Sequence, residues 1–422
     1  MKRKERDYNN ENEEENEKDT NPCKLDLDSL PLDLKMVILA RLSAKSLMKL
    51  RRVSKIWSSI IRSRGFIDSF YSISSKQSRF IVALSNSVFG KPAEKLTFFF
   101  SFSHDDGDDS SSLLPNFEMA IPKCSFSNYS DSLASFHGIL AVQADSKWLM
   151  CNPSTEQFVK LPATTAFVGY DPIDDQYKVL SWNRTRYGYN GHLQHKVLTL
   201  GDGEVWRHIK DTPLPYRATQ TNICVNHFLY YVAYLTQTKD MDHMVLVCFD
   251  VRSEKLSFIN APKDVVQWGR KAVFIEYKRK LASIVRGPYD RFHSFDLWIL
   301  EDVEKHEWSK QTCVFPSSVW DDVECGKMYF PGTNKAGEII MAPKRLSSDF
   351  RPFYIFYYNV ETKNIRRVRL LGIGDSEEFR RSYGFQSTAG SRHSLVLIAH
   401  QHVESVGFFK DPRINLTGLE GS

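Results

Sequence analysis

Histidines and acidic residues are the first candidates for chemistry in this 422-residue chain. Two loose pairs, His192/His195 and His400/His402, lack the cysteine or carboxylate pattern that would complete a metal shell. The segment HDDGDDSSS at 104–112 has the acidic residues of a calcium loop but not its closing Glu. We therefore interpret the histidines as solvated or strand-end residues and the acidic segment as a hairpin tip, and we expect no metal and no cofactor.

The seven cysteines offer no better route to catalysis. They are scattered, odd in number and never in C-x-x-C spacing, which indicates reduced thiols rather than a disulfide framework or a zinc site. Cys124 and Cys151 have no base that the sequence can pair with them, so a nucleophilic role has no support. Since G-x-S-x-G, H-E-x-x-H and P-loop motifs are also missing, we expect a non-catalytic protein.

Apolar residues at helical spacing dominate the string LDSLPLDLKMVILARLSAKSLMKLRRVSKIW, from Leu27 to Trp57. The spacing predicts one helix that starts near Pro31 and a second that is capped by Ser43, continues through Trp57 to Ile61 and ends near Gly65. So short a unit cannot bury all its apolar residues by itself. Some must therefore contact another protein, or the neighbouring domain if the unit is only a helical cap.

The net charge of +5 is concentrated in the same short unit. Residues 1–24 carry six Lys/Arg and eight Asp/Glu, residues 25–66 carry nine and three, and the other residues carry 41 and 40. A nucleic-acid binder typically spreads a basic face over its main domain, so we expect no nucleic-acid partner. Lys45, Lys49, Arg51, Arg52 and Lys55 either steer an acidic partner or form a solvated helix face.

The N-terminal tail, residues 1–24, is charged and poor in apolar residues, which predicts disorder. It has no apolar stretch that would serve as a secretory signal, and no run in the chain approaches the length of a membrane span. We therefore expect a cytoplasmic or nuclear protein with no membrane partner. The KRKER cluster is either a nuclear import signal or part of a solvated tail.

Short runs rich in Val, Ile, Phe, Tyr and Trp replace the helical pattern beyond residue 79. A hairpin phrase recurs with turns near Asn152, Gly201, Asp250, Glu301 and Asn359, spaced about 50 residues apart. Such spacing matches a four-stranded propeller blade, with the kelch type as the nearest match, and predicts about six blades. The fold class is thus mainly β, a β-propeller-like domain behind a small all-α unit, with a β-sandwich as the alternative.

Two parts of the chain resemble known families. The helical string resembles the F-box, through Leu30-Pro31, Asp33-Leu34, Ile38-Leu39, Leu42, Lys45-Ser46-Leu47, Leu50-Arg51, Val53, Lys55 and Trp57. The remainder resembles the plant F-box-associated interaction domain, through NPSTEQFVKLP at 152–162 and GYDPIDDQYKVL at 169–180. Val37 and Ser43 depart from the acidic residue and the proline that many F-boxes have there, without removing the ability to dock.

This resemblance implies a domain plan. Residues 1–24 form a charged tail, 25–66 the F-box, 67–78 a helical or irregular linker, 79–410 the propeller-like domain and 411–422 a second tail. It also implies the target-recognition subunit of an SCF-type ubiquitin ligase, which meets a cullin and a RING subunit through a Skp-type adaptor. The residues implied to contact the adaptor are Leu30, Pro31, Leu34, Ile38, Leu39, Leu42, Ser46, Leu47, Leu50, Val53 and Trp57.

The target protein would bind the loops on one face of the β domain. Aromatic and Arg residues are the usual anchors of such contacts, although packing between blades is an alternative role for each of them. The candidates are Trp182, Arg186, Tyr187, Tyr189, Tyr216, Arg217, Trp268, Arg270, Tyr289, Arg291 and Trp320. Two other functions stay open: a ligase-independent binding module for a peptide or a glycan, and a propeller enzyme.

Overall fold

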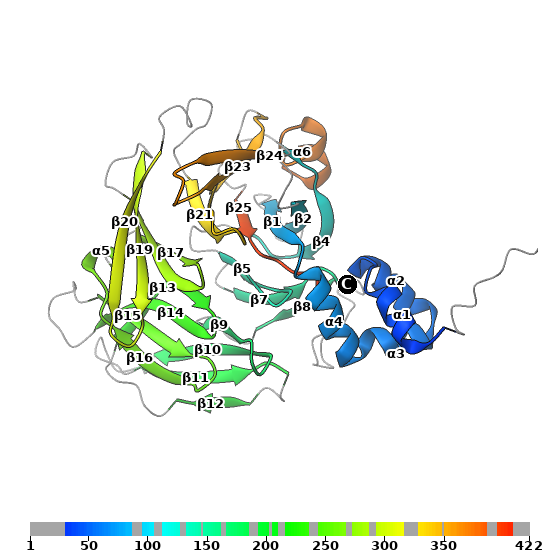
Figure 1. Cartoon of the computed structure of the whole chain (residues 1–422), viewed down its shortest axis with the longest axis horizontal. Coiled ribbons are helices and arrows are strands. Elements are labelled where there is room, and N and C mark those ends of the chain that lie inside the picture. The colour runs from blue at the N-terminus through cyan, green and yellow to red at the C-terminus, as the bar shows by residue number, and fades with distance from the viewer. Residues whose placement is uncertain are drawn as a thin grey trace, which may run out of the picture.

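Four N-terminal helices precede six sheets that are arranged in a ring, as Figure 1 shows for the computed structural model. Neighbouring strands pair antiparallel except for one parallel pair in the last sheet. The structure describes residues 30–86, 95–104, 112–126, 132–144, 147–161, 166–184, 193–201, 205–209, 216–235, 244–266, 272–286, 293–315, 328–347, 350–385 and 395–407. The ring confirms the predicted six-bladed propeller and excludes the sandwich alternative.

Serine residues divide the N-terminal part into four short helices, which we call the helical unit. These are α1 (Leu32–Leu39), α2 (Ala44–Val53), α3 (Lys55–Arg62) and α4 (Arg64–Ser74). Ser43, Ser54 and Ser63 each have extended backbone and accept a hydrogen bond from an N–H of the helix that follows. The predicted cap at Ser43 is confirmed. The long second helix was wrong because Ser54 interrupts it, and Gly65 lies inside α4.

The first three blades of the ring are built from the N-terminal part of the β region and one C-terminal strand. From the axis outward, blade 1 contains β25 (Val396–Ala399), β1 (Ser78–Asn86), β2 (Leu96–His104) and β4 (Asn116–Pro122). Blade 2 contains β5 (Ser132–Phe136), β6 (Ile139–Ala144), β7 (Lys147–Asn152) and β8 (Gln157–Lys160). Blade 3 contains β9 (Ala166–Asp171), β10 (Gln176–Arg184), β11 (Leu193–Thr199) and β12 (Trp206–His208).

The other three blades follow in chain order. Blade 4 contains β13 (Tyr216–Val225), β14 (Phe228–Leu235), β15 (Met244–Asp250) and β16 (Lys255–Ile259). Blade 5 contains β17 (Ala272–Tyr277), β18 (Lys280–Arg286), β19 (Ser294–Asp302) and β20 (Glu307–Val314). Blade 6 contains β21 (Met328–Thr333), β22 (Ile339–Pro343), β23 (Phe353–Tyr358), β24 (Ile365–Leu370) and the added strand β3 (Ser112–Leu113). Two short helices, α5 (Lys263–Val266) and α6 (Glu377–Tyr383), lie outside the strands.

The apolar core lies between neighbouring blades. Separate buried clusters join blades 1 and 6, 5 and 6, 1 and 2, and 4 and 5, while one larger cluster joins blades 2, 3 and 4. Strands buried on both faces explain why the sequence runs are nearly continuous in Val, Ile, Phe and Tyr instead of alternating with polar residues.

The repeated hairpin phrase is the turn between the third and fourth strands of a blade. In blades 2, 4, 5 and 6 an Asn or Asp side chain accepts a hydrogen bond from the backbone N–H two residues later, at Asn152, Asp250, Asp302 and Asn359. The fourth residue after each of these has positive φ, namely Glu156, Glu254, His306 and Lys363. In blade 5 this turn residue is Asp302 rather than the expected Glu301, because a bulge shifts the strand register there.

The C-terminal strand closes the ring. β25 pairs antiparallel with β1, from Ile81 with Ala399 to Leu84 with Val396, so the two ends of the β region complete one sheet. The chain then continues past blade 2, where Asn152 Nδ2 donates to the carbonyl oxygens of Ser405 and Gly407 at 2.9 Å each. Figure 1 shows this segment running from β25 towards α4. The pairing completes the four-stranded sheet of blade 1.

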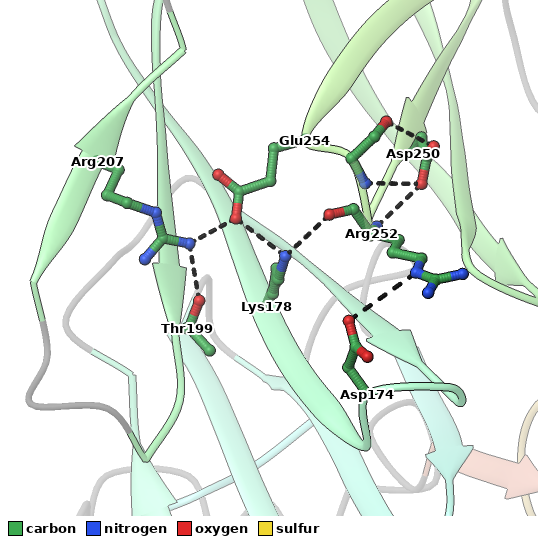
Figure 2. A network of polar contacts seen from close by, with 8 residues as sticks. Asp174, Lys178, Thr199, Arg207, Asp250, Arg252 and Glu254 are labelled. Carbon is green, nitrogen blue, oxygen red and sulfur yellow. Dashed lines mark hydrogen bonds and ion pairs between the residues drawn. The ribbon is translucent and has the colours of Figure 1, made fainter.

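Polar contacts join blades 3 and 4, as Figure 2 shows. Glu254, in the β15–β16 turn, accepts from Lys178 Nζ of β10 at 2.9 Å and from Arg207 Nη2 of β12 at 2.5 Å. The Lys178 side chain is only 7% exposed, so Glu254 supplies the negative charge that its ammonium group needs. Although partial burial acts to raise it, the hydrogen bonds from Arg207 and Lys178 lower the pKa of Glu254.

We predict that Glu254→Gln lowers the free energy of unfolding by about 2 kcal/mol near neutral pH, because Lys178 is left buried without its counter-ion. A lowered carboxylate pKa stabilises the fold above its ordinary value of 4.5, and this contribution is lost as pH falls through the lowered pKa. The difference in unfolding free energy between wild type and Glu254→Gln should therefore become smaller in acid.

Urea denaturation at about pH 7 and about pH 3.5 measures this gap. The control is Glu361→Gln, which removes the same charge from an exposed ion pair with Lys278 and should not measurably change stability. A gap for Glu254→Gln that stays constant between the two pH values would show that Glu254 does not act through its charge.

Candidate functional site

The helical unit exposes an unusual number of large apolar side chains. In the part of the chain that the structure describes, eight such side chains lie between residues 30 and 77, compared with six in all the rest. Seven of the eight form what we call the apolar surface: Leu32, Leu34, Val37, Ile38, Leu42, Val53 and Ile56. The exposed fraction reaches 80% at Val53. Concentrated exposure of this kind marks a contact with another molecule.

Helix α1 shows why this surface stays uncovered. Its sequence, LDLKMVIL, is apolar on most sides, whereas a helix at a domain surface usually has one apolar stripe. Lys35 and Leu39, four residues apart, face the helical core and are buried. Leu34 and Ile38, also four residues apart, lie on a different side and are exposed. One face of α1 therefore packs against the rest of the chain, and another face stays exposed to solvent.

A small core holds the helical unit together. It consists of Leu39, Ala40, Ala44, Leu47, Ile60, Ile61, Phe66, Phe70 and, from the far end of the sequence, Val406. Leu47 and Val406 are both fully buried. This core depends on a residue that follows the closure strand, so the helical unit and the ring share one structural element.

The structure distributes the eleven predicted adaptor residues among three environments. Exposed members are Pro31, Leu34, Ile38, Leu42 and Val53, and half-buried members are Leu30, Ser46, Leu50 and Trp57. Leu39 and Leu47 are buried in the chain's own core, so they cannot contact a partner directly and their assignment needs correction. Leu32, Val37 and Ile56 are exposed apolar residues that were not among the predicted adaptor contacts, although the apolar character of α1 on most sides could have identified the first two.

A basic margin accompanies the apolar surface. Lys49, Arg52 and Lys55 are exposed, and Arg51 is half-buried with its Nη1 3.9 Å from Met48 Sδ. Partial burial lowers the pKa of Arg51, and the positive charges of Arg62 and Arg52 lower it further. Crowded positive charge of this kind favours an acidic partner.

Lys45 differs from the other basic candidates because it contacts the ring. Its Nζ lies 3.3 Å from Glu118 Oε2 of β4 and also donates to the carbonyl oxygen of Phe117. Glu118 is 5% exposed, and it also accepts hydrogen bonds from Ser101 Oγ and Asn116 Nδ2. The sequence interpretation of Lys45 as a steering charge is therefore incomplete: Lys45 compensates a buried carboxylate and fixes α2 against blade 1.

Helix α4 contacts one end of the ring. The rings of Tyr71 and His137, the latter in the β5–β6 turn, have centroids 3.7 Å apart. Lys335, in the β21–β22 turn, donates from Nζ to the carbonyl oxygens of Ser75 at 2.6 Å and Gln77 at 2.7 Å. Turns between first and second strands thus meet the helical unit, and in an antiparallel blade the connection from second to third strand leaves from the opposite end.

Most of the predicted target-binding residues fall outside the part of the chain that the structure describes. Arg186, Tyr187, Tyr189, Trp268, Arg270, Tyr289, Arg291 and Trp320 lie outside the described residues, and Arg217 is exposed on β13. Trp182 and Tyr216 are buried between blades 3 and 4, where Tyr216 Oη is 2.8 Å from His195 Nε2. Trp182 and Tyr216 therefore pack between blades, and their prediction as target-contact residues is corrected. Burial lowers the pKa of His195 to about 4.

Of the remaining candidates for chemistry, His192 and residues 105–111 lie outside the described residues. His402 is buried and His400 is half-buried, and both have structural contacts. Ser135 Oγ lies 3.0 Å from His402 Nδ1, and the ring of His400 stacks on Phe80. Burial lowers the pKa of His400 to about 3. Within the described residues no group of His, Cys, Asp and Glu has a metal-binding arrangement. Among the helices described, none combines the length and apolar character that crossing a bilayer demands.

Comparison with known families matches both parts of the chain. Residues 27–69 match the F-box domain, and residues 80–403 match the F-box associated beta propeller domain. The second match is to a family of its own and does not confirm the kelch-type label that the repeat length suggested.

Curated relatives come from Arabidopsis thaliana. The putative F-box protein At1g32660 is 61% identical over 90% of this chain and 84% of its own length, and the F-box protein At1g30790 is 49% identical over 91% and 99%. The F-box protein DOR is 35% identical over 82% of this chain and 89% of its own. Among solved structures, apo AztD from Citrobacter koseri covers 76% of this chain and 98% of its own at 11% identity, with a TM-score of 0.35 that is too low to support any conclusion.

The same substitution at two leucines tests the division between core and surface. Leu47→Ala should lower the local unfolding free energy of the helical unit by about 3 kcal/mol, because it opens a cavity in a fully packed core. Leu34→Ala should change it by less than about 0.5 kcal/mol, since this side chain is half in solvent. Native-state hydrogen exchange of the α2 and α3 amides measures both. Equal losses of local unfolding free energy for Leu47→Ala and Leu34→Ala would contradict the assigned burial.

Proposed function

The chain belongs to the F-box proteins that carry an F-box associated β-propeller domain, and from this premise we propose that it is the target-recognition subunit of an SCF-type ubiquitin ligase. The helical unit binds a Skp-type adaptor, which in turn joins the chain to a cullin and a RING subunit. The ring binds the protein to be modified. Ubiquitin transfer takes place on the other subunits, and this chain contributes proximity.

The observation that carries this proposal is the apolar surface on α1, at its end, and at the α2–α3 junction. Burying apolar side chains is the main favourable term in most protein association, at about 25 cal/mol per Å². Leu34, Ile38 and Val53 are already held by folded helices, so an adaptor covers them without ordering a flexible segment first. An F-box is the family feature that accounts for leaving such a surface open.

The two ends of the ring support separate binding sites for the adaptor and the target. The helical unit contacts the end of the ring with the first-to-second-strand turns. Strands β10 and β18, which precede sequence segments rich in aromatic and Arg residues, end at the other side of the ring. A target bound there does not compete with the adaptor for the same surface. We propose the cytoplasm or the nucleus as the place of action, since the ligase partners and their targets are found there.

Fixed orientation is the second requirement of such a receptor. A target must be held where the conjugating enzyme reaches it, and misplacement costs transfer rate. Three contacts restrain the helical unit on the ring: Lys45 with Glu118, Lys335 with the end of α4, and Val406 in the helical core. The proposed receptor therefore binds the adaptor and the target at separate sites and holds the two sites in a fixed relative orientation.

A negative charge introduced into the apolar surface tests adaptor binding. We expect Leu34→Asp or Val53→Asp to weaken recovery of the Skp-type adaptor at least about tenfold, because a carboxylate in the centre of an apolar contact cannot be solvated. The matched control is Ile173→Asp, which places the same charge at an exposed isoleucine in the β9–β10 turn. Quantitative co-precipitation from a purified mixture provides the measurement. Recovery that is equal for all three variants would refute the proposal.

The basic margin should act on the rate of association. We predict that Lys49→Glu combined with Lys55→Glu slows adaptor association several-fold at low salt, with the difference disappearing in about 0.5 M salt as the charges are screened. Lys255→Glu combined with Lys263→Glu, at exposed positions on β16 and α5, is the control for net charge because it makes the same change of charge on the ring. Stopped-flow or surface-plasmon measurements give the rates. A salt-independent defect would mean that these lysines contribute by packing instead.

A further inference from the structure

The ring encloses a cavity of about 440 Å³ along its axis. Every blade contributes wall residues from its innermost strand, for example Ser135, Tyr170, Cys224, Glu276, Thr333 and Ala399. Tyr71 of α4 also lies in this wall, so the cavity is bounded by the helical unit as well as by the blades. Its volume falls within the range of about 300–1,000 Å³ that is typical of small-ligand sites.

Glu276 of β17 is the only acidic residue in the wall. Among the residues that the structure describes, none forms an ion pair or a hydrogen bond with its carboxylate, whereas its backbone carbonyl accepts from Thr333 Oγ1 at 2.9 Å. Burial raises the pKa of Glu276, and the exposed Arg279 in the next turn opposes this rise only in part. Glu276 is half-buried, so its carboxylate is open to a cation that enters the cavity from solution.

The basic residues of the wall have other contacts. Lys344 lies in blade 6, where its Nζ is 5.9 Å from the centre of the Tyr329 ring. His400 is neutral at physiological pH, because burial lowers its pKa to about 3. The Nδ1 of His137 faces Asp175, outside the wall, at 3.2 Å. Among the described residues, the Glu276 carboxylate therefore has no ion-pair or hydrogen-bond partner in the wall.

Aromatic rings make up much of the same wall. Phe274 precedes Glu276 by two residues on the same face of β17, and Tyr170, Phe330 and Tyr71 come from three other elements. Aromatic rings together with a carboxylate are the groups that recognise ammonium cations, because both the ring quadrupole and the acid attract positive charge.

We propose that the axial cavity binds an organic ammonium group, with the Glu276 carboxylate as its counter-ion. A free aliphatic diamine and the lysine side chain of a bound polypeptide carry the same chemistry, so either is a possible source. This site is independent of the ligase assignment, because its evidence lies in the ring. Tyr71 belongs to α4, so an occupant of the cavity lies beside the last helix of the helical unit.

Calorimetric titration of the full chain tests this site with two probes, putrescine and a capped Gly-Lys-Gly peptide. Wild type should bind at least one of them, and Glu276→Gln should weaken that binding at least about tenfold through loss of a charge-assisted contact. Glu361→Gln removes the same charge far from the wall and should bind as wild type does. Because Glu276→Gln removes an uncompensated charge and keeps the shape, its melting temperature should not fall.

The two probes also separate the sources. Binding of putrescine alone supports a free diamine, and binding of the peptide alone supports a lysine side chain from a partner. Failure of wild type to bind either probe would overturn the proposal and leave the cavity to water. Binding that is equally strong in wild type and Glu276→Gln would overturn it as well. Loss of adaptor binding in the variants of the helical unit has no bearing on either result.

Discussion

The pairing of β25 with β1 is the interaction on which the rest of this structure depends. It joins the two ends of the β region into one sheet, and without it blade 1 lacks its innermost strand. The same segment then continues to Val406, which completes the core of the helical unit. One stretch of fewer than about fifteen residues therefore closes the ring and anchors the helices. Folding of the helical unit is coupled to completion of the ring.

This coupling gives the proposed receptor its geometry. The helical core is satisfied on the side that faces Val406, and the Lys45–Glu118 contact restrains α2 against blade 1. What remains uncovered is the opposite side of α1 and the α2–α3 junction. The apolar surface is thus a consequence of how the small unit is anchored, since its apolar residues exceed what one core can bury. A partner that covers it is held at a fixed angle to the ring.

Local sequence signals predicted most of the fold. The Asn or Asp turn residues at Asn152, Asp250 and Asn359 recur because a side-chain hydrogen bond and a positive φ shape each outer hairpin, and this allowed the blades to be counted. The break at Ser54 was missed because its apolar neighbours continue the helical spacing across it. Contacts between distant segments were beyond any local pattern. Nothing in the sequence around Lys45 indicates Glu118, or around Leu47 indicates Val406, so the division of apolar residues into core and surface needed the structure.

Surface labelling of the full chain with and without a Skp-type adaptor tests the central claim most directly. Carbene footprinting followed by mass spectrometry reports how much of each side chain solvent reaches. If the apolar surface is the docking site, labelling of Leu34, Ile38 and Val53 falls sharply in the complex, while labelling of Ile173 and Leu114 on the ring stays unchanged. Unchanged labelling of the helical unit in a complex that has formed, or protection confined to the blades, would contradict it.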